Sequence, residues 1–164
     1  MRAHATHRGI MGTRVLSVSS MSLPALFRSQ KEQILSSWEA IVASLAGSRQ
    51  LPASLIRNQM PQFLDWLTGM LEHGGRASDF PHEQVLQHAS RRVTAGFDLS
   101  EVISEYVVLR ECLLEAWERE PTALTAPRQL RLMNQALDDA ITYTAVLYAR
   151  MRLFSDAHAT PGQQ

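Results

Sequence analysis

Apolar side chains recur at steps of three and four residues along most of this chain, and this period is typical of amphipathic α-helices. The pattern is clearest over residues 96–118. Gly96 suits the position just after a preceding helix, Asp98 is a good N-cap, and Glu101 completes a capping box with it. One apolar stripe follows this start: Leu99, Val102, Ile103, Tyr106, Leu109, Leu113 and Trp117. We therefore predict a central helix that turns this stripe toward the core.

The same period, interrupted by Pro, Gly and Ser, predicts helices along the rest of the chain. Their predicted ranges are 22–46, 51–58, 61–73, 81–95 and 127–156. Because the connection between the helix at 81–95 and the central helix is very short, we expect these two to pack antiparallel. No segment alternates with period two, so we predict an all-α fold. It would be a single domain of five or six helices, either a helical bundle or globin-like.

Two of these helices have faces that bear on function. In the helix at 81–95, the predicted apolar face is Val85, Leu86, Ala89 and Val93, with His88 and Arg92 beside it. In the last helix, apolar or small residues follow a heptad pattern: Leu130, Met133, Leu137, Ala140, Thr144, Leu147, Met151 and Phe154. Ile141 and Tyr148 widen this stripe. The pattern fits a dimerising signalling helix and fits an ordinary bundle helix equally well.

The two ends of the chain predict disordered tails, at residues 1–21 and 157–164, around a helical domain at 22–156. The first tail carries three Arg residues, no acidic residue and no apolar run, which excludes a secretory signal. An organelle transit peptide, or a protein that begins at Met21, is an alternative to a disordered tail.

Composition narrows the class of partner. The formal net charge is zero, which argues against nucleic acid and anionic membrane surfaces, since both favour a basic protein. No apolar run approaches the roughly 20 residues that cross a bilayer. The single cysteine, Cys112, excludes an intramolecular disulfide and fits a reducing, cytoplasmic environment.

The sequence lacks the common catalytic patterns. There is no HExxH, no pair of histidines at helical spacing with a matching carboxylate, no GxSxG and no glycine-rich phosphate loop. We therefore predict no catalytic residue, no metal site and no enzyme. Cys112 is interpreted as a small hydrophobe, or as a thiol sensor if it is exposed. Glu101 and Glu105 are interpreted as part of a solvated helix face.

His88 has two interpretations. It could be an axial ligand of haem, because one histidine is sufficient for that role. The alternative, which we favour, is that His88 lies at the margin of the core and pairs with a carboxylate. No cofactor is otherwise predicted. If there is a ligand pocket, we expect it to be an apolar cleft between helices; the same aromatic residues would alternatively be core. They are Trp38, Phe63, Trp66, Tyr106 and Trp117.

Arg110 falls inside the apolar stripe of the central helix. A guanidinium cannot escape burial by losing its proton, so it needs partners there. The candidates are Glu105, Asn134 and Asp138. We predict that Arg110 is more than half buried and bonded to another helix, in a network that fixes helix register or acts as a switch. The predicted network is His88, Arg92, Glu105, Arg110, Asn134 and Asp138. The alternative is an arginine whose stem packs while its head lies in water.

Several stretches together resemble one family. They are Trp38, LPASLIRNQMPQFLDWL at 51–67, HASRR at 88–92, GFDLSEVISEYVVLR at 96–110 and LMNQALDDAI at 132–141. These stretches are similar to the N-terminal sensor domain of RsbT co-antagonist proteins of the RsbRD type, which also precedes the kinase core of some bacterial sensor histidine kinases. The resemblance spans roughly residues 25–155. It implies an all-α input domain, related to the non-haem globin-like domain of stressosome proteins, that dimerises and signals to an output domain.

The function that follows is a non-enzymatic sensory or regulatory module of bacterial signal transduction, which works through helix packing and homodimerisation. The expected partner is a downstream kinase or a STAS-domain protein. The sequence to Gln164 contains neither, so we expect a free-standing module or part of a longer protein. The alternatives are a haem or gas sensor that uses His88, and a protein–protein adaptor without a ligand.

Overall fold

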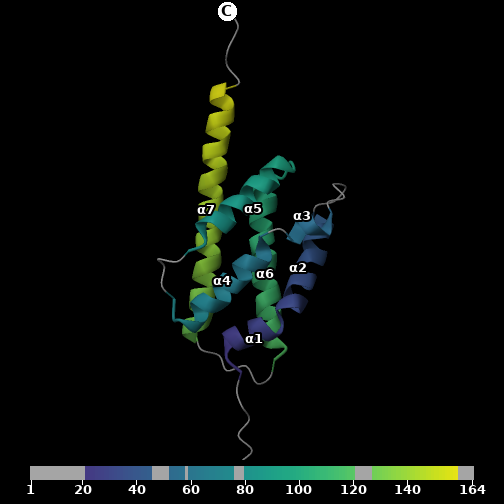
Figure 1. The fold of residues 1–164 in the computed structure, drawn as a ribbon, viewed down its shortest axis with the longest axis vertical. Helices are drawn as coiled ribbons and strands as arrows, with labels where there is room; N and C mark the ends of the chain where they lie inside the picture. Colours follow the sequence, from purple (N-terminus) through teal and green to yellow (C-terminus); the bar gives the residue numbers. More distant parts are fainter. Residues whose placement is uncertain (1–20, 46–51, 58, 76–79, 121–126, 159–164) are drawn as a thin grey trace, which may run out of the picture.

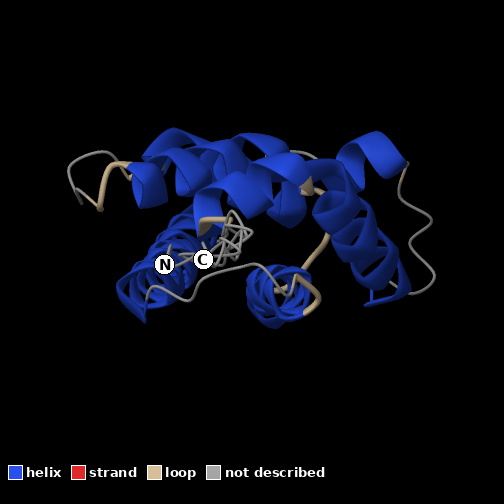
Figure 2. Cartoon of the chain, turned by 90° about the horizontal axis from the view of Figure 1, so that it is seen from below, coloured by secondary structure: helices blue, strands red, loops and turns tan. Residues whose placement is uncertain are grey.

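The computed structural model describes residues 21–45, 52–57, 59–75, 80–120 and 127–158, and most of both predicted tails lies outside these ranges. The described residues form helices and their connections, without a strand (Figure 2). The helices are α1 (Leu23–Ser29), α2 (Lys31–Leu45), α3 (Ala53–Arg57), α4 (Met60–Glu72), α5 (His82–Thr94), α6 (Leu99–Glu118) and α7 (Pro127–His158). The prediction of a single all-α domain is confirmed. The last helix continues to His158, slightly beyond its predicted end.

The first predicted helix is broken in two at Gln30, which corrects the prediction of one helix at 22–46. α1 begins as predicted, with Ser22 as its N-cap and Pro24 in its first turn. At its end the hydroxyl of Ser29 donates to the carbonyl of Leu26 at 2.9 Å, a local bond that competes with continued helix. The break lets α1 pack on α4 while α2 packs on α6. Counted as one broken helix, α1 and α2 bring the described total to the six predicted.

The helices lie in two layers. One layer holds α2, α6 and α7, with α6 in the middle and in contact with both neighbours (Figure 1, Figure 2). α4 and α5 belong to the second layer and cross α7. The expected antiparallel packing of α5 on α6 is wrong: after their short connection the two helices diverge, and α5 packs chiefly on α7 and α4.

That connection is a pair of helix caps, as its residues predict. Gly96 has a φ of 81°, the left-handed conformation that glycine adopts without strain. The amide of Phe97 donates to the carbonyl of Arg92 at 2.9 Å, which closes a Schellman motif at the end of α5. Asp98 and Glu101 form the predicted capping box at the start of α6. Tyr148 of α7 donates to the carbonyl of Phe97 at 3.4 Å, and burial raises the pKa of Tyr148 to about 12, so this hydroxyl keeps its proton.

The buried faces of α5 and α6 are rotated from those predicted. On α5 the buried residues are Val85, His88, Ala89 and Arg92, whereas Leu86 and Val93 are exposed. On α6 they are Val102, Glu105, Tyr106, Leu109, Cys112, Leu113 and Ala116. Ile103, Arg110 and Trp117 therefore lie at the margin of the α6 face instead of at its centre. The prediction that Glu105 belongs to a solvated face is wrong, because only 1% of this residue is exposed.

The heptad stripe of α7 packs within its own chain. Met133, Leu137, Ala140 and Thr144 are fully buried, and Leu147 is 9% exposed. Burying a leucine or methionine side chain contributes about 1.5–3 kcal/mol, so this stripe supports the fold itself. Beyond the α5–α6 connection, the C-terminal end of α7 projects from the rest of the domain (Figure 1).

Candidate functional site

Three buried polar side chains from α5 and α6 form the buried ion cluster: His88, Arg92 and Glu105. The Nε of Arg92 donates to Oε1 of Glu105 at 2.7 Å, and Nε2 of His88 lies 2.9 Å from Oε2 of the same carboxylate. Each of the three residues is 1% exposed. The interpretation of His88 as the partner of a carboxylate is confirmed, although the residue is fully buried and not at the margin.

Arg92 also caps a third helix. Its Nη1 and Nη2 donate to the backbone carbonyls of Leu55 and Ile56, each at 2.6 Å. These carbonyls belong to the end of α3, where helical hydrogen bonding leaves them without a partner. The guanidinium also lies 5.0 Å from the ring centre of Phe97, within the range of a cation–π contact. One arginine thus joins α5 to α6, to α3 and to the α5–α6 connection.

The core around the cluster is tightly filled. Nε1 of Trp38 on α2 donates to the backbone carbonyl of Glu105 at 2.8 Å. The His88 ring lies edge-on to the Tyr106 ring with centres 5.7 Å apart, and burial raises the pKa of Tyr106. An ion cluster removed from water is stable only while its partners remain bonded. The arrangement therefore fixes the relative positions of four helices.

The surroundings of His88 do not fit haem. The space beside the ring is filled by the side chains of Met60, Phe63, Val85 and Tyr106, and no cavity that could hold a water-sized probe remains there. The ring nitrogen that would have to bind iron is the one that faces Glu105. The chemistry of this residue is that of a buried ion pair.

Arg110 belongs to a separate pair. It bonds to the carboxylate of Asp138 on α7, one of its three expected partners, and 24% of its side chain is exposed. Asn134 donates instead to the carbonyl of Leu130 in its own helix, at 3.0 Å. The six residues predicted as one network are therefore divided into the buried ion cluster and the Arg110–Asp138 pair, with Asn134 in neither.

Replacing Arg110 with leucine is expected to change the free energy of unfolding by less than about 1 kcal/mol, with the fold retained. Its partner Asp138 is 63% exposed, so water replaces much of the lost attraction. The Nε of Arg110 is also buried without a hydrogen-bond partner among the described residues, and removing it offsets part of the cost. Urea denaturation of the two proteins measures the difference; a loss above about 2 kcal/mol would show that the pair stabilises the core.

Cys112 lies in the core on α6. The residue is 2% exposed, and burial raises the pKa of its thiol, with the nearby carboxylate of Glu115 acting in the same direction. Reactive cysteines are exposed and have a lowered pKa, so the interpretation of Cys112 as a small hydrophobe is the one that fits.

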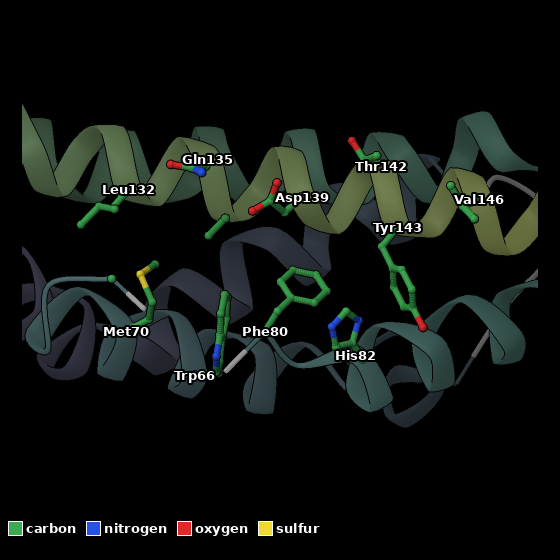
Figure 3. Close-up of a pocket in the computed structure, with 12 residues that line it drawn as sticks. Trp66, Met70, Phe80, His82, Leu132, Gln135, Asp139, Thr142, Tyr143 and Val146 are labelled. Carbon is green, nitrogen blue, oxygen red and sulfur yellow. The ribbon is translucent and has the colours of Figure 1, made fainter. Parts of the chain in front are cut away.

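A pocket of about 380 Å³ lies between α4, α7 and the start of α5 (Figure 3). Side chains of α7 form one wall, and those of α4 with Phe80 and His82 form the opposite wall. The lining residues are Trp66, Met70, Gly75, Phe80, His82, Leu132, Gln135, Ala136, Asp139, Thr142, Tyr143 and Val146. We call this site the α4–α7 pocket. It is open to solvent on one side and mostly apolar.

Of the five aromatic residues predicted to line a ligand pocket, Trp66 alone lines the α4–α7 pocket. Trp38, Phe63 and Tyr106 are buried in the core, and Trp117 lies half-buried on α6. Sequence reasoning missed Phe80 and Tyr143, because one stands in a connection and the other lies off the heptad stripe. The sequence Phe80–Pro81–His82, in which two ring side chains flank a proline at the start of α5, was the available signal for part of this wall.

Aromatic rings connect the pocket to the buried ion cluster. The Trp66 and Phe63 ring centres are 5.6 Å apart, those of Phe63 and Tyr106 are 5.7 Å apart, and the Tyr106 ring contacts His88. These are ordinary separations for packed aromatic pairs. The pocket and the cluster are therefore two parts of one continuous interior.

In the described part of the chain, no group of three or more His, Cys, Asp or Glu residues is placed to hold a metal ion. None of the described helices is long and apolar enough to cross a membrane.

The fold and the site define an all-α domain whose buried polar groups bind one another and support the fold, with an open pocket between α4 and α7. The chain belongs to the family described as the RsbT co-antagonist protein rsbRD N-terminal domain, whose sequence model matches residues 31–158. The resemblance seen in the sequence is thereby confirmed. The family is one of regulatory stress-response signalling domains that act in partner-based pathways. No curated protein and no solved structure matches the chain, and the globin-like arrangement stays a prediction.

Proposed function

We propose that this chain is a non-enzymatic sensory module that transmits a signal through helix packing and homodimerisation. The observation that carries the proposal is the course of α7. This one helix of 32 residues lines the α4–α7 pocket, packs on α6 through its apolar stripe and projects beyond the domain (Figure 1). A change in packing at the pocket would therefore shift α7, and a continuous helix would carry that shift to its projecting end.

The projecting end of α7 is the proposed dimer contact. The stripe from Met133 to Leu147 is already buried within the chain, so it cannot also serve as a two-chain seam. The output partner is proposed to be a kinase or a STAS-domain protein, as the family membership suggests. An output domain joined to α7, or bound to it, would receive both the position of the helix and the symmetry of the dimer.

Light scattering tests the dimer. We expect the full chain to have twice the 18.4 kDa mass of one chain, in equilibrium with monomer on dilution. A chain that stops after Arg150 loses the projecting end but keeps the buried Leu147 and Tyr148, and it is expected to be a folded monomer by light scattering and circular dichroism.

A chain that stops after Asp156 is the matched control, because it keeps most of the projecting end and should remain dimeric. A full chain that is monomeric at every concentration would contradict homodimerisation. A dimer that survives the stop after Arg150 would place the contact elsewhere on the domain.

A ligand-free adaptor is the second candidate. It is favoured by two large apolar side chains on the outer face of α5, since Leu86 is 39% and Val93 is 37% exposed. The two functions differ in a measurable way: an adaptor binds a protein through such a face and leaves the α4–α7 pocket empty, whereas a sensor fills the pocket.

A further inference from the structure

We infer that the α4–α7 pocket binds a small organic cation that has an aromatic or branched apolar body. The inference deepens the proposed sensory function, on which it rests, by naming the chemical class of the signal. It rests on the aromatic residues of the pocket, on the charge of its lining and on the different environments of two adjacent aspartates of α7: Asp138 pairs with Arg110, whereas Asp139 lines the pocket.

The aromatic wall offers faces to a flat or branched apolar group. The Phe80 ring is the centre of this aromatic group, which reaches across to Tyr143 on the α7 side: its ring centre lies 5.5 Å from that of Trp66, 4.8 Å from that of His82 and 6.0 Å from that of Tyr143. All three contacts are edge-on. The ring faces are therefore not covered by stacking on one another. Aromatic faces attract cations as well as apolar groups. The volume of about 380 Å³ lies at the small end of the usual range for ligand pockets, which suits a ligand of one ring and a short arm.

Among the described residues that line the pocket, Asp139 is the only carboxylate, and none is Lys or Arg. The described part of the lining therefore carries a negative charge. No hydrogen bond or ion pair joins Asp139 to another described residue, whereas the next residue back, Asp138, pairs with Arg110 on another face of α7. Arg128 lies near the Gly75 end of the pocket, where its guanidinium donates to the carbonyl of Gly74 at 3.3 Å. A cationic ligand meets an unpaired carboxylate here, while an anionic ligand would be repelled by it.

The end of the pocket is set by a close approach of Gly75 to Leu132 of α7. Gly75 has a φ of 75°, and a Cβ at this position would lie 2.7 Å from Cδ2 of Leu132. The connection after α4 can therefore lie directly against α7, which closes this end while the other side stays open. The pocket is thus a built feature of the α4–α7 contact.

The test uses three probes that share a phenyl ring and a two-carbon arm: 2-phenylethylammonium, 2-phenylethanol and 3-phenylpropanoate. Binding is followed in the full chain by the NMR signals of the three tryptophan indole N–H groups, with Trp66 assigned from Trp66→Phe. We expect the cation to shift the Trp66 signal saturably, with Trp38 and Trp117 much less affected. It should bind roughly three- to tenfold more tightly than the alcohol, and the carboxylate should bind most weakly.

Two aspartate variants form a matched pair for this test. Asp139→Asn should weaken binding of the cation about two- to fivefold and leave the alcohol unchanged, whereas Asp138→Asn should change neither. Equal affinity for amine and alcohol, or tightest binding of the carboxylate, overturns the assignment of a cation. The absence of any Trp66 shift, or equal shifts at all three indoles, overturns the pocket as a site.

These outcomes are independent of the dimer measurement. A chain that is dimeric but does not bind the cation refutes the site and leaves the sensory proposal standing. A chain that binds the cation but is monomeric keeps the site and refutes homodimerisation.

Discussion

Replacing Glu105 with alanine is expected to lower the free energy of unfolding by about 3–5 kcal/mol, because it leaves Arg92 and His88 buried without their shared carboxylate. Arg92 cannot lose its charge, and its other bonds, to the carbonyls of Leu55 and Ile56, do not neutralise it. Small domains have only about 5–15 kcal/mol of stability in total, so this change removes a large part of it. Urea denaturation followed by circular dichroism measures the loss.

Two controls separate charge from side-chain volume. Glu105→Gln keeps the shape and one acceptor oxygen for Arg92, and it should cost less than the alanine variant, about 1–3 kcal/mol. Glu111→Ala removes an exposed carboxylate from the same helix and should change stability by less than about 0.5 kcal/mol. If Glu105→Ala is as stable as Glu111→Ala, the buried ion cluster does not hold the helices together.

Replacing Trp38 with alanine is the second large effect, with an expected loss of about 3–5 kcal/mol. The side chain is 0% exposed, so its removal leaves a cavity between α2 and α6. It also removes the indole donor to the carbonyl of Glu105, whose side chain carries the cluster. Thermal and urea unfolding should both show this loss of stability. In the double variant with Glu105→Ala the total loss should be smaller than the sum of the two single losses, because the two residues are in contact.

Trp38→Phe and Trp117→Ala are the controls for this prediction. The phenylalanine variant keeps most of the buried ring surface but not the N–H donor, and it should cost about 1–2 kcal/mol. Trp117 is only half-buried, so its removal should cost clearly less than that of Trp38. Equal losses for the two alanine variants would show that burial does not set the stability at these positions.

The features that the sequence predicted well are local ones. The capping box of Asp98 and Glu101, the left-handed Gly96 and the Pro24 start of α1 depend on neighbours within a few residues. Their signals can therefore be read along the chain. The pattern does not predict the break at Gln30, because both halves continue the same helical period and differ only in the helices on which they pack.

The polar centre of the domain was predicted only in part. The sequence pattern places His88 and Arg92 beside the apolar face of their helix and Glu105 on a solvated face, because charged residues are rarely buried. What reverses this expectation is contact across helices: the carbonyls that Arg92 caps lie 36 and 37 residues earlier in the chain. A backbone carbonyl carries no side-chain signal, so no pattern of residue types could reveal it.

The sequence by itself therefore determined the helices, their caps and the family, since these depend on periodicity, local hydrogen bonds and residue identity. The tertiary structure alone decided which face of α5 and α6 is buried, which of the three candidate partners Arg110 binds, that Asp139 lines a pocket, and where Trp66, Phe80 and Tyr143 meet. The physical reason is that helix rotation follows from the packing of all neighbours at once. A turn of a few tens of degrees exchanges a solvated side chain for a buried one without any change in the apolar period.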